Sequence, residues 1–238
     1  MCQTISKVLF IVLSLLSKLS FAQEVIITEI HENPIKAVEP ESFDYIDSGY
    51  VLNEDRYVAT LSGFVVNSGQ SVLSSLFNSF WAKANELGAN SYRIERVENS
   101  EHKISVYISV YNLSDSQFEE MILLYPQNMV YVIGDIDKRR TPKKIKFNNE
   151  KFILAPMEFI SYQNKVGENA VLSIGGFLGA KASIKGQEDR LPMHLSLSGF
   201  NVGPDRLDQL SLSFNTGRIY PIDLNFGQFL VNVLTEKE

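Results

Sequence analysis

The sequence predicts an α+β protein in which a ferredoxin-like βαββαβ domain is followed by an all-β antiparallel sandwich or small barrel. Between residues 56 and 134, strand-like and helix-like segments follow in the order β-α-β-β-α-β. After residue 143 only β-like runs follow, separated by turn residues. Charge also divides the chain, because residues 23–137 have a net charge of -12 and residues 138–238 have a net charge of +4.

Residues 1–22 have the pattern of a cleaved signal peptide. Lys7 precedes an apolar run, and Ser20 and Ala22 are small residues at the positions that a signal peptidase reads. The run is too short for a permanent membrane span, and Lys18 interrupts it. We therefore expect export to the bacterial periplasm or the cell exterior, with no transmembrane segment after cleavage.

Cys2, the single cysteine of the chain, lies inside this segment. The mature chain would then contain no disulfide, no catalytic cysteine and no thiolate metal site. Such a chain depends on its apolar core for stability, which is feasible at about this length.

The predicted first domain, residues 23–137, begins with a short strand in 24–34 and a polar loop over 35–49. Two β-rich runs in 50–66 predict a hairpin. A helix follows, with Gly88 as its C-terminal cap. Its apolar face comprises Leu73, Leu76, Phe77, Phe80, Trp81, Ala84 and Leu87.

Two further strands, 91–98 and 102–113, precede a second helix in this domain. Ser114 and Gln117 form a capping-box pattern at its start, and Pro126 ends it. Residues 129–134 then supply the last strand.

A basic connector, residues 138–148, leads into the predicted all-β domain, residues 143–238. The β-like runs of this domain are 151–161, 170–184, 192–200, 208–215 and 218–234, the last of which we expect to contain two strands.

The stretch KANELGANSYRIE, residues 83–95, resembles the helix–strand joint of small bacterial envelope domains, including the Rcs-type outer-membrane stress-sensor lipoproteins. That family relies on disulfides and a lipidated cysteine, and the mature chain predicted here has neither. The resemblance implies the bacterial envelope and supplies no site residues.

One candidate ligand site is the polar face of the strand 102–113. Tyr107 and Tyr111 alternate with aliphatic residues there, and Arg93 lies on the neighbouring strand. The tyrosine rings could stack on a flat ligand or a sugar. The alternative is that the N-terminal segment or the β-domain covers this face.

A second candidate is the basic run. Lys138, Arg139, Arg140, Lys143, Lys144 and Lys146 could bind a phosphate-rich surface or an acidic glycan. The alternative, which we favour, is a solvated connector whose charges face the acidic first domain.

The sequence contains no motif for nucleotide binding or serine catalysis, and it predicts no cofactor and no metal site. Glu29 with His31, and Asp135 with Asp137, lack further ligands at a recognisable spacing. An acidic, exported chain is also a poor nucleic-acid binder. We therefore expect a non-catalytic envelope protein that binds a protein or glycan partner. The alternative is a glycan-directed hydrolase whose Asp and Glu pairs come from distant strands. The pattern does not predict an oligomeric state.

Overall fold

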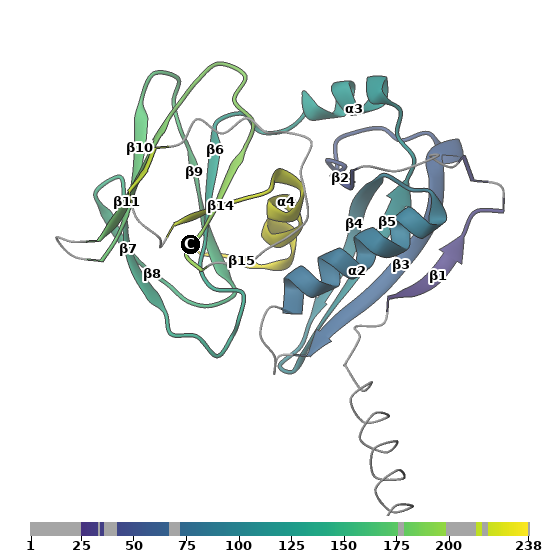
Figure 1. Cartoon of the computed structure of the whole chain (residues 1–238), viewed down its shortest axis with the longest axis horizontal. Helices are drawn as coiled ribbons and strands as arrows, with labels where there is room; N and C mark the ends of the chain where they lie inside the picture. The colour runs from purple at the N-terminus through teal and green to yellow at the C-terminus, as the bar shows by residue number, and fades with distance from the viewer. Residues whose placement is uncertain are drawn as a thin grey trace, which may run out of the picture.

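The computed structural model describes residues 25–32, 34–35, 42–66, 72–175, 179–198, 213–215 and 219–237. Within these ranges the chain forms three α-helices and three five-stranded sheets, named sheets A, B and C here, so the mixed α/β class is confirmed (Figure 1). The predicted signal peptide lies outside the described residues. In the described part, no helix combines the length and the apolar character that a membrane span requires.

Sheet A has the strand order β1-β3-β5-β4-β2. Its strands are β1 (Ile26–Ile30), β2 (Asp44–Tyr45), β3 (Tyr57–Val66), β4 (Ser91–Asn99) and β5 (Lys103–Tyr111). All neighbours are antiparallel except β2 and β4. A short 3₁₀ helix, η1 (Glu54–Arg56), leads into β3.

Helix α2 (Val72–Leu87) covers one face of sheet A, as Figure 1 shows. The aliphatic side chains of β5 from Ile104 to Val110 are buried on this side, whereas Tyr107 and Tyr111 point to the other. Gly63 of β3 allows the helix to approach, because a Cβ there would lie 2.6 Å from Leu76 Cδ1. Gly88 ends the helix with a φ of 79°, as its position predicts.

Sheets B and C lie on the other side of the molecule. Sheet B contains β6 (Met129–Ile133), β9 (Glu158–Gln163), β12 (Met193–Ser196), β14 (Tyr220–Ile222) and β15 (Thr235–Glu236). Sheet C contains β7 (Lys143–Phe147), β8 (Glu150–Leu154), β10 (Asn169–Ile174), β11 (Ala180–Lys185) and β13 (Ser213–Asn215). One apolar core, built largely from Val, Ile, Leu and Ala, contains residues of both sheets.

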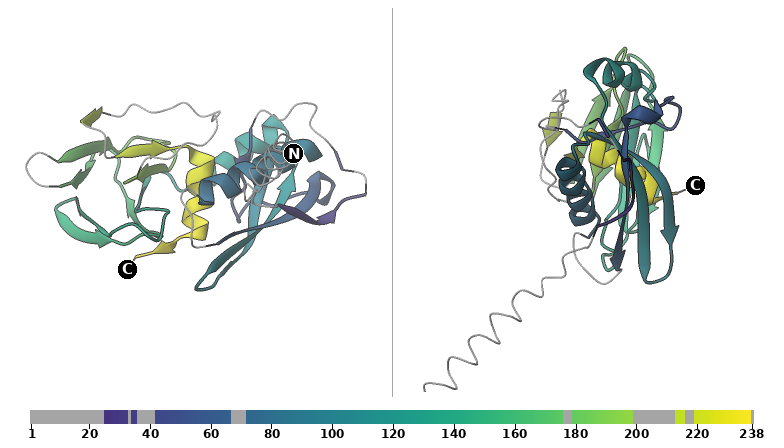
Figure 2. Two further views of the ribbon diagram at one scale, coloured as in Figure 1. Left: turned by 60° about the horizontal axis from the view of Figure 1, so that its bottom comes forward. Right: turned by 90° about the vertical axis from the view of Figure 1, so that its right-hand side faces the viewer.

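Helix α4 (Leu224–Val233) lies between the two sides and joins them (Figures 1 and 2). It contacts β12 and β15 of sheet B, and also α2, β2 and β4. Phe226 and Phe229 reach Phe77 of α2, with ring centroids 5.1 and 5.3 Å apart. Helix α4 therefore belongs to the same aromatic core as α2.

Buried hydrogen bonds fasten α4 to sheet A. Asn225 Nδ2 donates to Asp44 Oδ1 at 3.0 Å, and Asn225 Oδ1 accepts from the Tyr45 amide at 2.9 Å. The Tyr92 hydroxyl donates to the Asn225 carbonyl at 2.6 Å. Because such bonds are directional, they set the position of α4 more narrowly than apolar contact would.

Helix α3 (Asp115–Ile122) connects β5 to β6. Its predicted capping box is present, since the Gln117 amide donates to Ser114 Oγ and the Ser114 amide donates to Gln117 Oε1.

The last strand of the predicted ferredoxin-like sheet lies elsewhere. In that pattern β6 would join the sheet of β3, β4 and β5, but it pairs with β9 and β12 in sheet B. The two edges of sheet A are occupied by β1 beside β3 and β2 beside β4. The N-terminal segment thus takes the edge positions that β6 would need.

Two local predictions also need correction. Residues 224–233, expected as strand, form α4, because Phe226, Phe229, Leu230 and Val233 recur at helical spacing and Asp223 caps the start. The hairpin expected in 50–66 is absent, since η1 precedes a single strand. The domain limits 23–137 and 143–238 stay a prediction. Strand pairing shows which elements are neighbours, whereas a domain limit is the point at which two units can fold separately.

Candidate functional site

The face of sheet A opposite α2 carries a row of polar residues across four strands. The strand registers place Glu29 beside Thr60, Thr60 beside Ser109, and Ser109 beside Arg93. The hydroxyls are linked, because Thr60 Oγ1 lies 2.7 Å from the Tyr57 hydroxyl and 3.3 Å from Ser109 Oγ. This row brings together residues that are far apart in the sequence.

Three irregularities of register lie beside this row. They fall between Ile27 and Glu29 in β1, between Tyr57 and Ala59 in β3, and between Ile94 and Arg96 in β4. A β-bulge bends its strand and redirects neighbouring side chains, and bulges are common next to functional sites. Here they lie in β1, β3 and β4, three of the four strands that carry the row.

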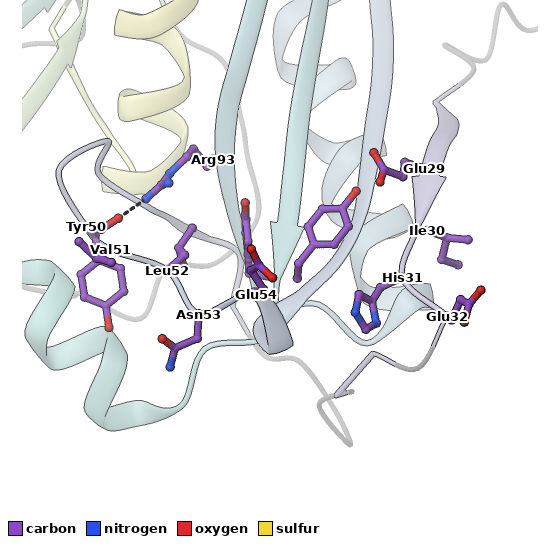
Figure 3. Close-up of a pocket in the computed structure, with 12 residues that line it drawn as sticks. Glu29, Ile30, His31, Glu32, Tyr50, Val51, Leu52, Asn53, Glu54 and Arg93 are labelled. Carbon is purple, nitrogen blue, oxygen red and sulfur yellow. Dashed lines mark hydrogen bonds between the residues drawn. The ribbon is translucent and has the colours of Figure 1, made fainter.

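A hollow of about 850 Å³ lies beside this row, and we call it the sheet A pocket (Figure 3). The end of β1, the loop before η1, and single residues of β3, β4 and β5 line it. The lining comprises Glu29, Ile30, His31, Glu32, Tyr50, Val51, Leu52, Asn53, Glu54, Tyr57, Arg93 and Tyr111. Three carboxylates against one guanidinium make the lining acidic.

Arg93 holds one wall of the sheet A pocket in place. Its Nη2 donates to the Tyr50 carbonyl oxygen at 2.6 Å (Figure 3), and also to the Asp47 carbonyl oxygen at 3.1 Å. Its Nε is buried without a hydrogen-bond partner in the described residues. On the far side of this loop, the Tyr50 hydroxyl donates to Glu120 of α3 at 3.3 Å. Arg93 thus positions the loop by charged hydrogen bonds to backbone.

Aromatic side chains form another part of the lining. The rings of Tyr57 and Tyr111 meet edge to face with centroids 5.7 Å apart, and His31 lies against Tyr57 at 6.4 Å. Burial raises the pKa of both tyrosines, and the charge of a nearby glutamate raises each further. Their hydroxyls therefore stay protonated at neutral pH and can donate hydrogen bonds to a ligand.

The structure separates the three residues predicted for this face. Arg93 and Tyr111 line the sheet A pocket, and Tyr107 does not. Tyr107 lies farther along β5, where the Arg96 guanidinium stacks 4.1 Å from its ring centroid and its hydroxyl donates to Glu98 at 3.4 Å. The N-terminal segment pairs at the sheet edge through β1, and its end becomes part of the lining.

The basic run divides into an exposed turn and a strand. Arg139 donates from Nε and Nη2 to the Asp137 carboxylate, both at 2.9 Å, and these bonds lower the pKa of Asp137. Arg140 lies 3.9 Å from the same carboxylate. Lys143 lies 3.6 Å from Asp135 and also donates to the Leu197 carbonyl. These cations therefore face carboxylates only a few residues away.

Lys144 and Lys146 have a different environment. They are exposed and alternate along β7 with the buried Ile145 and Phe147. Lys138 is exposed in the turn before the strand. The six basic residues therefore do not act as one patch.

The alternating pattern around His194 predicts a partly exposed surface histidine, but the structure buries it. It lies between sheet B and α4, only 1% exposed, and its ring stacks on Tyr131 with centroids 4.9 Å apart. Neither ring nitrogen has a partner in the described residues, and burial lowers its pKa to about 3. The histidine is therefore neutral in the folded protein. An alternating strand pattern gave no sign that a helix would cover it.

In the described part of the chain, no three His, Cys, Asp or Glu side chains come close enough to hold a metal ion. Comparison with known proteins finds no matching family model, and no characterised protein or solved structure with significant similarity.

Proposed function

We propose that this chain is an exported, non-catalytic protein of the bacterial envelope that binds an oligosaccharide, neutral or carrying amino groups, in the sheet A pocket. The observation that carries this proposal is the lining itself, in which protonated tyrosines stand beside several carboxylates. Export is inferred from residues 1–22 of the sequence alone.

The chemistry of the lining supports this class of ligand in two ways. Carboxylates accept hydrogen bonds from sugar hydroxyls or amines, and tyrosine rings offer apolar area with a polar tip. The lining contains Glu29, Glu32 and Glu54 against the single cation Arg93, whose Nη2 is already used by backbone carbonyls. An acidic ligand would meet uncompensated negative charge and should be rejected.

The test is calorimetric titration with oligosaccharides of equal length that are neutral, amine-bearing or rich in uronic acid. Neutral and amine-bearing ligands should bind, and uronic acids should not. Tyr111→Leu should weaken binding about tenfold by removing the ring and hydroxyl. Tyr107→Leu is the matched control, because it changes the same residue type on the same strand outside the pocket. It should leave affinity unchanged.

Three results would contradict the proposal: equal binding of uronic acids, equal loss in both variants, or no binding at all. Release of new reducing ends during the titration would instead support the glycan-directed hydrolase.

A second proposal concerns the arrangement of sheets B and C. We infer that sheets B and C act as one sandwich unit, which is supported by the apolar core that they share. Helix α4, which closes the outer side of sheet B, is an addition to that architecture.

A further inference from the structure

On strands β7, β8, β10 and β11, whose side chains the structure describes, the outward positions of sheet C hold five lysines and no carboxylate. Burial alternates along β7, β10 and β11, and the register of β8 against β7 extends the outward positions to β8. These positions are Lys144, Lys146, Lys151, Ile153, Asn169, Val171, Ser173, Lys181, Ser183 and Lys185. The single acidic residue of the four strands, Glu150, is exposed at the start of β8 and has the inward parity, opposite Phe147. We call the five cations the lysine face.

Three of these lysines form one row across the sheet. Lys151 pairs with Lys146, Lys146 with Ser173, and Ser173 with Lys181. Like charges directly opposite each other destabilise a sheet, so this row weakens the fold that carries it. None of the five forms an ion pair within the described residues, whereas Lys143, which points inward from the same β7, has Asp135.

We propose that the lysine face docks the protein on an anionic lipid bilayer. The chain is acidic overall, with a net charge of -6, so a concentration of unpaired cations on one face is unexpected for a solvated surface. Charge complementarity selects a negatively charged partner. The shape and composition of the face then select among anionic partners.

The lysine face suits a planar partner, such as a bilayer, better than a linear polymer. Four strands of five or six residues present a sheet of roughly 14 by 17 Å, without the groove that tracks a linear polyanion. Its cations are all lysines, which act as point charges for diffuse headgroups, and the outward positions contain no aromatic ring for stacking on a sugar or base. Ile153, 56% exposed beside Lys144, adds apolar area that can enter the headgroup region.

The position of this face gives docking a definite orientation. Sheet C lies at one end of the long axis and sheet A at the other (Figures 1 and 2). The acidic first half would be repelled by an anionic bilayer, while the lysine face is attracted. The sheet A pocket would then lie at the end of the molecule that is remote from the membrane.

The test measures sedimentation of the purified protein with vesicles of phosphatidylcholine alone or mixed with phosphatidylglycerol. Binding should require phosphatidylglycerol and decline with salt. Replacing Lys146, Lys151 and Lys181 by Gln should reduce partitioning about 100-fold, since each lysine near an anionic surface contributes roughly fivefold.

The control variant replaces Lys83, Lys103 and Lys237 by Gln, which removes the same charge outside sheet C. It should lower partitioning less than about threefold. All three proteins carry the same N-terminal segment, so the difference between the variants reports the lysine face. Urea unfolding should show that both variants remain folded.

Equal losses in the two variants, or equal binding to uncharged vesicles, would overturn the proposal. Retention on a heparin column without vesicle binding would overturn it in favour of an anionic glycan. Lysine-dependent self-association without vesicle binding would overturn it in favour of a second copy, whose acidic half would then be the partner.

Discussion

The open faces of sheets A and C lie at opposite ends of the molecule. They differ in whether their cationic side chains have partners within the protein. On sheet A, Arg96 stacks on Tyr107 and pairs with Glu98 at 3.1 Å, and Arg93 is bonded to backbone. On sheet C, five lysines are exposed without an ion pair in the described residues. The first face satisfies its cations internally and keeps a shaped, acidic pocket. The second leaves its cations available to an external surface.

Helix α4, which joins sheet A to sheets B and C, also lies between two kinds of core. The core beneath sheet A is rich in Phe and Tyr and reaches through α4 into sheet B. Among the described residues, the core between sheets B and C contains one buried aromatic side chain, Phe147, with Val, Ile, Leu, Ala and Met around it. Helix packing leaves room for rings, whereas two facing sheets about 10 Å apart are filled by smaller side chains.

The largest effect is expected at the joint itself, from Gly227→Ala. A Cβ at this position in α4 would lie 2.2 Å from His194 Cγ and 2.5 Å from Nδ1, so α4 or the imidazole must move. Alanine favours the helix by about 1 kcal/mol, yet the clash should reduce the free energy of unfolding by about 2 to 4 kcal/mol in urea titration.

Adding His194→Ala to Gly227→Ala provides the control. If the clash is the cause, the double variant should be more stable than the sum of the single losses predicts. Additive losses would show that Gly227 matters for another reason.

A smaller effect should appear as the pH dependence of the same joint. The folded pKa of His194 is about 3, below the unfolded value of about 6.5, so the unfolded chain binds the proton more readily. Stability should therefore decline as the pH falls through 6.5, by about 2 kcal/mol between pH 7.5 and 5. His194→Leu should remove this part of the slope.

His102, whose side chain is 84% exposed, is the matched histidine control. Its replacement by Leu should leave the dependence of unfolding free energy on pH as it is in the wild-type protein. A slope that is the same in both variants would show that His194 does not titrate on unfolding.

The smallest effect concerns the lysine face. Lys151→Glu should place opposite charges across the strand pair with Lys146, raising the free energy of unfolding by about 0.5 kcal/mol. Lys151→Gln should give an intermediate gain, because it removes repulsion without adding attraction. Vesicle binding should decline in the same order. A lower free energy of unfolding for Lys151→Glu would contradict the inference that this row of lysines weakens the fold.

Much of the local structure could be predicted because its signals are short-range. The apolar spacing of α2, the left-handed Gly88 and the capping box at Ser114 each involve residues within one or two turns. The alternation in β5 likewise placed Tyr107 and Tyr111 on one face. Residues 226–233 had the helical spacing of α4, but their aromatic and branched side chains suggested strands.

The candidate site was predictable only in part. Arg93 and Tyr111 were identified because a strand pattern shows which side chains share a face. Nothing in the spacing indicated that Glu29, Tyr57 and the loop around Tyr50 would join them, since that depends on three bulges and on the order of strands.

By itself, then, the sequence determined the mixed α/β class, the asymmetry of charge and most element types, because these follow from composition and local periodicity. Only the tertiary structure decided which strands pair and which side chains become neighbours. It placed β6 in sheet B, covered His194 with α4, and collected outward lysines from three strands on one face. Edge strands compete for the same backbone hydrogen bonds, and only the complete set of packed elements decides which of them pairs.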